Sequence, residues 1–230
     1  MKSSWCIKKA LNISFYILLI IGAVIAFTLE RHKQIYIIPL LGFNILAIYF
    51  SHKQYKLNVF FVAALITAII TDIVSLLAFS KFHNIVVFLT SLYITGFTLT
   101  LKKYVSQSKF ANFLKIYVLI SIILIAYVLY MILSYLMNFI TGNSMLITLL
   151  CAFLLVVLVS TIAIIYLSNT YKNGPIILTS GMLLFFQIAL STINQYLYPH
   201  RLFSVLILLT HFMSLYFLAK FIVETKPING

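Results

Sequence analysis

The sequence is poor in charged residues, and above all in acidic ones. Only 8% of its 230 residues are charged, and the acidic side chains number three: Glu30, Asp72 and Glu224. A soluble domain carries charge on about a quarter of its residues, and a globule with so few charges could not cover its surface in water. The shortage excludes a soluble enzyme, and the apolar content excludes a disordered chain.

Cysteine is also scarce, and the usual metal and cofactor motifs are missing. Cys6 and Cys151 lie far apart in the sequence and form no CxxC pair. This spacing excludes a disulfide scaffold and gives little support for a metal site. The chain has no HExxH, no glycine-rich phosphate loop, no GxSxG and no histidine pair at i, i+4. The sequence therefore predicts neither a metal nor another cofactor.

Long apolar runs are what the sequence has in abundance. Hydrophobic residues make up 63% of the chain, and the mean hydropathy is +1.14. A helix needs about 20 mostly apolar residues to cross a bilayer, and the runs do not alternate with polar residues as barrel strands would. The sequence predicts one all-α domain, 1–230, that is a polytopic bundle of eight transmembrane helices. We place them at about 10–28, 35–51, 57–80, 84–101, 110–138, 145–168, 174–196 and 200–222.

The basic residues predict how the bundle is oriented. The net charge is +13, but the lysines and arginines lie in short gaps between apolar runs, which favours membrane lipid over nucleic acid as the partner. With the N-terminus inside, only four of the 16 fall in outer loops: Arg31, Lys33, Lys81 and Arg201. The positive-inside rule then places both termini in the cytoplasm of a multi-pass cell-membrane protein, and a bacterial inner membrane is expected. The first apolar run, 11–27, has no cleavage site directly after it, so we expect a retained helix.

Asp72 is the one acidic residue within the predicted membrane helices. Thr67, Thr71 and Ser75 lie beside it at a spacing of four residues, so this face is polar and should point into the bundle. An ionisable group within the bilayer is a functional candidate by default. Because burial disfavours a charged carboxylate, Asp72 would suit a general acid. It would equally suit a neutral, hydrogen-bonded structural carboxyl.

The last two predicted helices carry the other polar candidates. His211 lies near the middle of its helix, at a depth broadly similar to that of Asp72, so the two side chains could pair. The helix at 174–196 presents four polar residues along one face: Ser180, Gln187, Ser191 and Asn194. This face could line a substrate site, and it could equally be polar contact between helices.

Three stretches, in this order, resemble the YhhN-like family, whose characterised members are lysoplasmalogenases. Tyr36-Ile-Ile-Pro39-Leu-Leu is similar to the family's K-P-L-x-x-P-L entry to the second helix. Ala68-Ile-Ile-Thr-Asp72-Ile-Val-Ser-Leu-Leu is similar to its L-x-G-D-x-x-L-L segment. The run Gly181-Met-Leu-Leu-Phe185, followed by 208–220, is similar to its last two helices.

The resemblance implies a membrane hydrolase that cleaves the vinyl-ether bond of a lysoplasmalogen-like lipid. Asp72 stands at the family's acidic position and would be the catalytic general acid. Four further residues would bind the substrate: Ser75, Gln187, Asn194 and His211.

The chain departs from the family pattern at three places. Thr71 replaces the glycine before the acid, there is no imidazole near Ser91, and the second acid expected near Gln187 is missing. Vinyl-ether hydrolysis needs a proton donor and a group that directs water, so two alternatives stay open. One is a catalytically degenerate member that acts as a lipid-binding or accessory protein. The other is a small transporter or sensor subunit in which Asp72 is a proton or substrate site.

Overall fold

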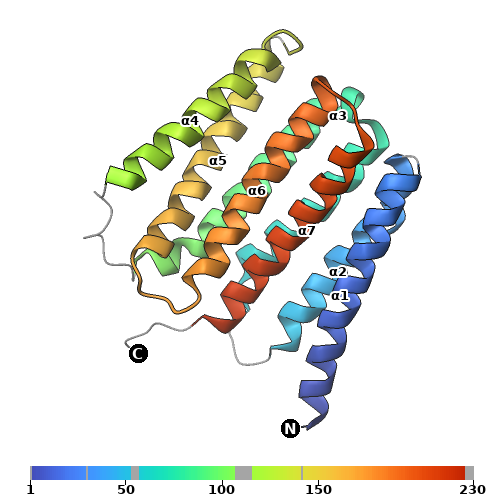
Figure 1. Ribbon diagram of the computed structural model, residues 1–230, viewed down its shortest axis with the longest axis vertical. Helices are drawn as coiled ribbons and strands as arrows, with labels where there is room; N and C mark the ends of the chain where they lie inside the picture. The colour runs from blue at the N-terminus through green and yellow to red at the C-terminus, as the bar shows by residue number, and fades with distance from the viewer. Residues whose placement is uncertain (1, 30, 53–56, 107–115, 141, 226–230) are drawn as a thin grey trace.

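A computed structural model describes residues 2–29, 31–52, 57–106, 116–140 and 142–225, and every regular element within these ranges is a helix. Figure 1 shows the helices side by side in one bundle. The elements are α1 (Lys2–Thr28), a 3₁₀ helix η1 (Arg31–Tyr36), α2 (Ile38–Ser51), α3 (Val59–Ser106), α4 (Ile116–Leu136), α5 (Asn143–Leu167), α6 (Gly174–Tyr196) and α7 (Arg201–Glu224).

Local chemistry explains several helix ends. Pro39 and Pro175 lie in the first turn of α2 and α6, where a residue without an N–H group loses no helical hydrogen bond. Gly142, at φ 62°, precedes α5, and Asn169, at φ 50°, follows it. Both have a positive φ, which glycine and asparagine tolerate better than other residues. The break predicted between the helices at 145–168 and 174–196 is confirmed.

The largest departure from the predicted layout lies in α3. We expected separate helices at 57–80 and 84–101, but helical backbone runs from Val59 to Ser106 without a break. The chain nevertheless doubles back. The rings of Phe61 and Phe97 lie 6.1 Å apart, whereas one straight helix would separate them by about 54 Å. This pair is centred on residue 79, so the reversal falls next to the predicted break, and the two halves of α3 are antiparallel.

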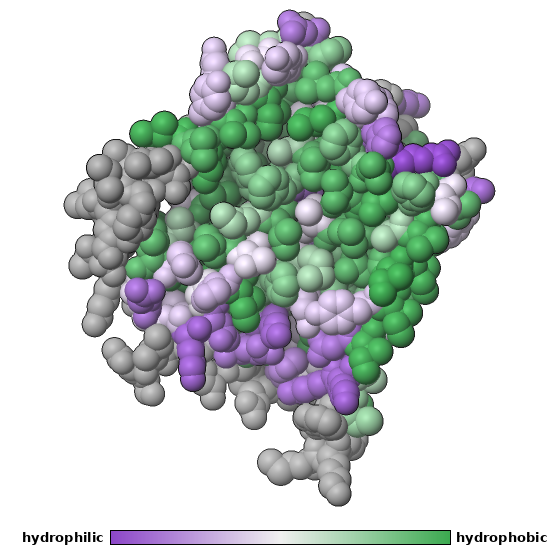
Figure 2. Space-filling view, in the orientation of Figure 1, coloured by the Kyte–Doolittle hydropathy of each residue, from purple (hydrophilic) through white to green (hydrophobic). Residues whose placement is uncertain are grey.

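Seven helical segments in the described part of the chain are long and apolar enough to cross a membrane. Two of them, Val59–Leu77 and Lys81–Ser106, come from the two halves of α3. Figure 2 shows a broad hydrophobic band with hydrophilic residues towards both ends of the bundle. These features indicate a multi-pass membrane protein.

The predicted helix at 110–138 falls partly outside the described residues. Its described part is α4, of which the apolar segment Ile123–Leu136 is shorter than a full span. Figure 1 places α4 at the edge of the bundle, beside α5. An eighth membrane crossing therefore stays a prediction.

Helix α7 lies at the centre of the packing, against α1, α2 and α6. Ser180 of α6 and Ser214 of α7 each donate a hydrogen bond of 2.8 Å to the other's backbone carbonyl. Both serines are at least 98% buried, so the two helices are joined by a reciprocal polar contact deep in the bundle. On the other side of α6, a Cβ at Gly181 would lie 2.8 Å from Ile162 of α5, so glycine permits this close approach.

The two ends of the bundle are built from different connections. Tyr104 donates to the carbonyl of Ile222, and Tyr171 donates to that of Tyr104, so the ends of α3 and α7 meet the α5–α6 connection. Figure 1 shows that α1 also begins at this end. We call it the terminal end. The opposite end, which we call the reversal end, holds η1, the turn of α3 and the α6–α7 connection.

Candidate functional site

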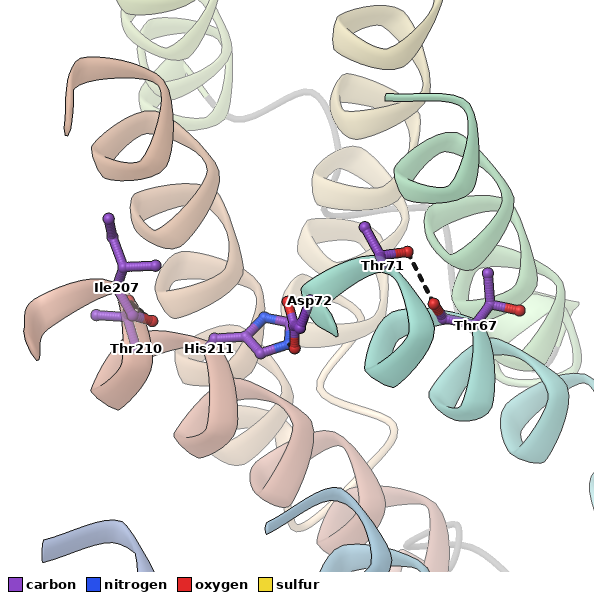
Figure 3. Close-up of polar contacts among 6 residues, drawn as sticks. All are labelled: Thr67, Thr71, Asp72, Ile207, Thr210 and His211. Carbon is purple, nitrogen blue, oxygen red and sulfur yellow. Dashed lines mark hydrogen bonds and ion pairs between the residues drawn. The ribbon is translucent and has the colours of Figure 1, made fainter. Parts of the chain in front are cut away.

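Asp72 and His211 form a close pair in the interior of the bundle. Asp72 comes from the first half of α3 and His211 from the middle of α7, and Figure 3 shows the imidazole ring directed at the carboxylate. The His211 Nε2 and Asp72 Oδ2 atoms lie 2.9 Å apart, with 3% and 19% of the side chains exposed. The distance is that of an ion pair, but the two groups are not aligned as a hydrogen bond. The structure thus brings together the two residues that the sequence placed at similar depth.

The threonines near the pair donate their protons elsewhere. Thr71 donates to the carbonyl of Thr67, and Thr67 to that of Ala63. Thr210, next to His211, donates to the carbonyl of Leu206. Each hydroxyl therefore serves its own helix (Figure 3), as is common for threonine within membrane helices.

A cavity of about 100 Å³ surrounds the pair. It is lined by η1, the start of α2, both halves of α3, α6 and α7. All five candidates from the sequence line it: Asp72, Ser75, Gln187, Asn194 and His211. Six more polar residues share its walls: Gln34, Thr71, Thr90, Tyr93, Ser191 and Ser204. The polar faces of three helices thus converge on one space.

Several polar atoms in the cavity wall have no hydrogen-bond partner among the described residues. They include Gln187 Oε1, His211 Nδ1 and Gln34 Nε2, in residues that are 8%, 3% and 5% exposed. An unpaired buried polar group costs about 1–3 kcal/mol, so three at one site call for a polar occupant. The cavity is large enough for several water molecules or one small polar group.

Four of the polar lining residues were not predicted: Gln34, Thr90, Tyr93 and Ser204. Gln34 follows a run of charged residues and precedes an apolar run, so in the sequence it resembles part of an ordinary loop. Tyr93 is 2% exposed. A single tyrosine within a predicted membrane helix gives no signal that it lines a cavity. Ser204 lies one turn into α7, where a serine is unremarkable.

A second, larger space of about 330 Å³ adjoins the cavity at the reversal end of the bundle, and we call it the vestibule. The two share Gln34, Asn194 and Ser204 in their walls. Asn194 accepts a hydrogen bond from the backbone N–H of His200 at 2.8 Å and donates one to Ser204 at 3.3 Å. Polar side chains therefore extend from the cavity around the Asp72–His211 pair to the connection between α6 and α7.

Among the described residues, the pocket at the terminal end is separate from the cavity. A pocket of about 50 Å³ lies there, lined by Asn12, His52, Tyr216 and Glu224 among others, and it shares no lining residue with the cavity. Tyr216 closes part of it by donating a 2.8 Å hydrogen bond to Asn12. The polar space around Asp72 is thus directed towards one end of the bundle.

A carboxyl group and an imidazole in contact can transfer protons in both directions. The described residues contain no cluster of three histidine, cysteine or acidic side chains that could hold a metal ion.

Comparison with known proteins gives no match to a protein family, a curated protein or a solved structure.

Proposed function

We propose that this chain is a divergent YhhN-like membrane hydrolase that cleaves the vinyl-ether bond of a lysoplasmalogen-like lipid. The observation that carries the proposal is the Asp72–His211 pair, buried at 2.9 Å in a polar cavity that continues into the vestibule. The resemblance of the sequence supplies the reaction class, and the pair supplies a proton donor with an adjacent proton acceptor.

The reaction needs one proton donor, one proton acceptor and one water molecule. The protonated Asp72 carboxyl donates to the alkenyl carbon that is not bonded to oxygen, which leaves an oxocarbenium-like carbon next to the ether oxygen. Water adds to that carbon and gives up a proton to His211. The resulting hemiacetal collapses to a fatty aldehyde and a glycerophospho-head group with a free hydroxyl, and His211 returns a proton to Asp72.

His211 takes the place of the missing second acid in this scheme. In a pair of carboxylates one would protonate the substrate and the other would direct water. Here the imidazole lies within ion-pair distance of the acid, and Gln187 presents an unpartnered side-chain oxygen to the same cavity. Gln187 is therefore assigned to orienting the water molecule, and Ser75 and Asn194 to contacting the substrate.

The two alternatives predict different surroundings for Asp72. A bundle that had lost its chemistry would need no polar space beside the carboxyl. A transporter would need polar access to the acid from both membrane faces. A cavity that continues towards one end of the bundle supports the hydrolase over both.

The proposal is tested by measuring aldehyde release with the full chain purified in detergent. The substrates are 1-alkenyl lysophospholipids with choline or ethanolamine head groups, and the control is the saturated 1-alkyl analogue of each. We expect aldehyde from the alkenyl lipids alone. No release from well-folded protein with either head group would contradict the proposal and favour the degenerate member.

His211→Gln is expected to slow aldehyde release by at least about tenfold, because a positioned proton acceptor contributes roughly 10²–10⁴-fold to such reactions. His83→Gln is the matched control, since His83 contacts Tyr196 and Thr148 and does not line the cavity. Initial rates of aldehyde release by the two variants and the wild type test this role of His211. Equal rates for all three would remove His211 from the mechanism.

We also propose that both termini lie in the cytoplasm, so that the vestibule opens on the outer face. In a background of Cys6→Ser and Cys151→Ala, Tyr198→Cys marks the reversal end and Lys172→Cys the terminal end. Both native side chains are exposed. A membrane-impermeant maleimide added to intact cells is expected to label Tyr198→Cys, and Lys172→Cys only after permeabilisation. The opposite labelling pattern would invert the orientation.

A further inference from the structure

Among the described residues, the wall of the vestibule contains a cation and no acid. Arg201 lies in its wall next to His200, and the described lining residues include no carboxylate. The remaining polar lining comes from amide and hydroxyl side chains: Gln34, Asn194, Gln195 and Ser204. The electrostatic character of this space therefore favours an anion.

The position of Arg201 is unfavourable for the helix that contains it. Arg201 is the first residue of α7, where the helix dipole is positive and a cation is destabilising. The same end presents backbone N–H groups that have no acceptor within the helix. A bound anion would offset this repulsion, because it would contact both the guanidinium group and the positive N-terminus of the helix.

His200 adds a further donor. Its Nδ1 atom accepts a hydrogen bond from the backbone N–H of Leu202 at 3.2 Å. A neutral His200 ring therefore carries its proton on Nε2, which is then free to donate.

Gln34 gives independent evidence for a ligand that accepts hydrogen bonds. It is 5% exposed, its Nε2 atom has no partner in the described structure, and it lines both the vestibule and the cavity. An amide donor buried without a partner is costly. An acceptor at the junction of the two spaces would satisfy it.

The spacing along α7 suits a lipid that extends from one space into the other. Arg201 and His211 are ten residues apart, which corresponds to about 15 Å along the helix. The arginine side chain covers part of this distance, and a glycerol backbone would cover much of the rest. A phosphate in the vestibule would thus direct the ether end of the same molecule towards Asp72.

We propose that the vestibule binds the phosphate of a lysophospholipid head group through Arg201, His200 and Gln34. This inference rests on the proposed function and adds to it the place and the residues that bind the phosphate of the substrate. It also assigns Arg201 to ligand binding, whereas in the sequence it counted only as a basic residue of an outer loop.

Binding to the detergent-purified full chain tests the inference, with lipids that cannot be hydrolysed. The probes are a saturated 1-O-alkyl glycerophosphate, the neutral 1-O-alkylglycerol and inorganic phosphate, and the readout is Kd. We expect the phosphate-bearing lipid to bind at least about tenfold more tightly than the neutral one, since hydrogen bonds to a charged group are worth about 1.5–3 kcal/mol. Equal Kd values for the two lipids would overturn the inference. Inorganic phosphate that binds as tightly as the phosphate-bearing lipid would overturn the assignment to a head group.

Variants at Arg201 separate binding from stability. Arg201→Gln should remove the preference for phosphate, and Arg201→Lys should retain part of it. Arg201→Glu should abolish it while raising or leaving unchanged the melting temperature, because an acidic residue suits the first turn of a helix. Lys81→Gln, a change at another exposed cation of the same end, is the control and should keep the wild-type Kd. Preserved phosphate preference in Arg201→Glu would overturn the inference.

This test can fail separately from that of the proposed function, because its readout is binding. If the protein binds the phosphate-bearing lipid through Arg201 but releases no aldehyde, the phosphate site is supported and the hydrolase activity is contradicted. If it releases aldehyde but binds both lipids equally, the hydrolase activity is supported and the phosphate site is contradicted.

Discussion

Asp72→Asn should lower the kcat of aldehyde release at least about 100-fold, the smaller end of the contribution expected of a positioned general acid. Asparagine is nearly the same size and keeps polar contacts with the cavity wall, but it cannot deliver the proton that starts the reaction. Steady-state kinetics with a 1-alkenyl lysophospholipid measure the change. Because the substitution removes a group that acts in the transition state, kcat should fall more than KM rises.

The matched control for Asp72→Asn is Thr67→Val. Thr67 lies on the same helix, donates only to the carbonyl of Ala63 in the hydrogen bonds of the structure, and does not line the cavity. Its loss should leave kcat near the wild-type value. Aldehyde release that survives in Asp72→Asn would preserve the enzyme but exclude Asp72 as its acid.

Gly42→Ala should destabilise the bundle, although alanine is the better helix former by about 1 kcal/mol. Gly42 lies in the middle of α2, and a Cβ there would overlap Cδ1 and Cγ1 of Ile69 in α3. Ile69 is only 6% exposed, so it has little room to move. Overpacking of this kind costs about 1–3 kcal/mol, which outweighs the gain in propensity. The melting temperature in detergent should therefore fall.

Two comparisons show whether the contact with Ile69 is the cause. Gly42→Ala combined with Ile69→Ala should be less destabilised than the two single changes together, because the second substitution removes the overlapping atoms. Gly174→Ala, whose Cβ would meet its nearest neighbour at an ordinary 3.4 Å, should have little effect. An increase in melting temperature for Gly42→Ala alone would show that α2 and α3 pack less closely than described.

The membrane helices could be predicted because length and apolarity are all that a bilayer span requires. The bounds of α6 agree with the predicted 174–196, since Pro175 marks the start of that helix. The region around Lys81 has neither glycine nor proline and only a few polar atoms, so its sequence indicated a break without indicating its form. The chain reverses there while its backbone stays helical, and this depends on packing between the halves of α3, at Phe61 and Phe97.

The inner site was largely predictable for one physical reason. Polar groups are costly in lipid, so those on membrane helices face the interior, and Asp72, Gln187 and His211 do so together. Gln34 and Arg201 could not be assigned in this way. They lie at helix ends, where polar residues are common, and their relation to the cavity depends on how η1 and the α6–α7 connection meet in space.

Proton transfer to carbon is the central claim, and running the reaction in D₂O tests it most directly. The released aldehyde, analysed by mass spectrometry at early times, should carry one solvent deuterium on the carbon next to the carbonyl. Turnover should also be slower than in H₂O, because the transferred proton comes from Asp72 in the step that limits the rate. Aldehyde that forms equally fast in both solvents, or that carries no deuterium, would contradict protonation by Asp72 as the step that breaks the vinyl ether.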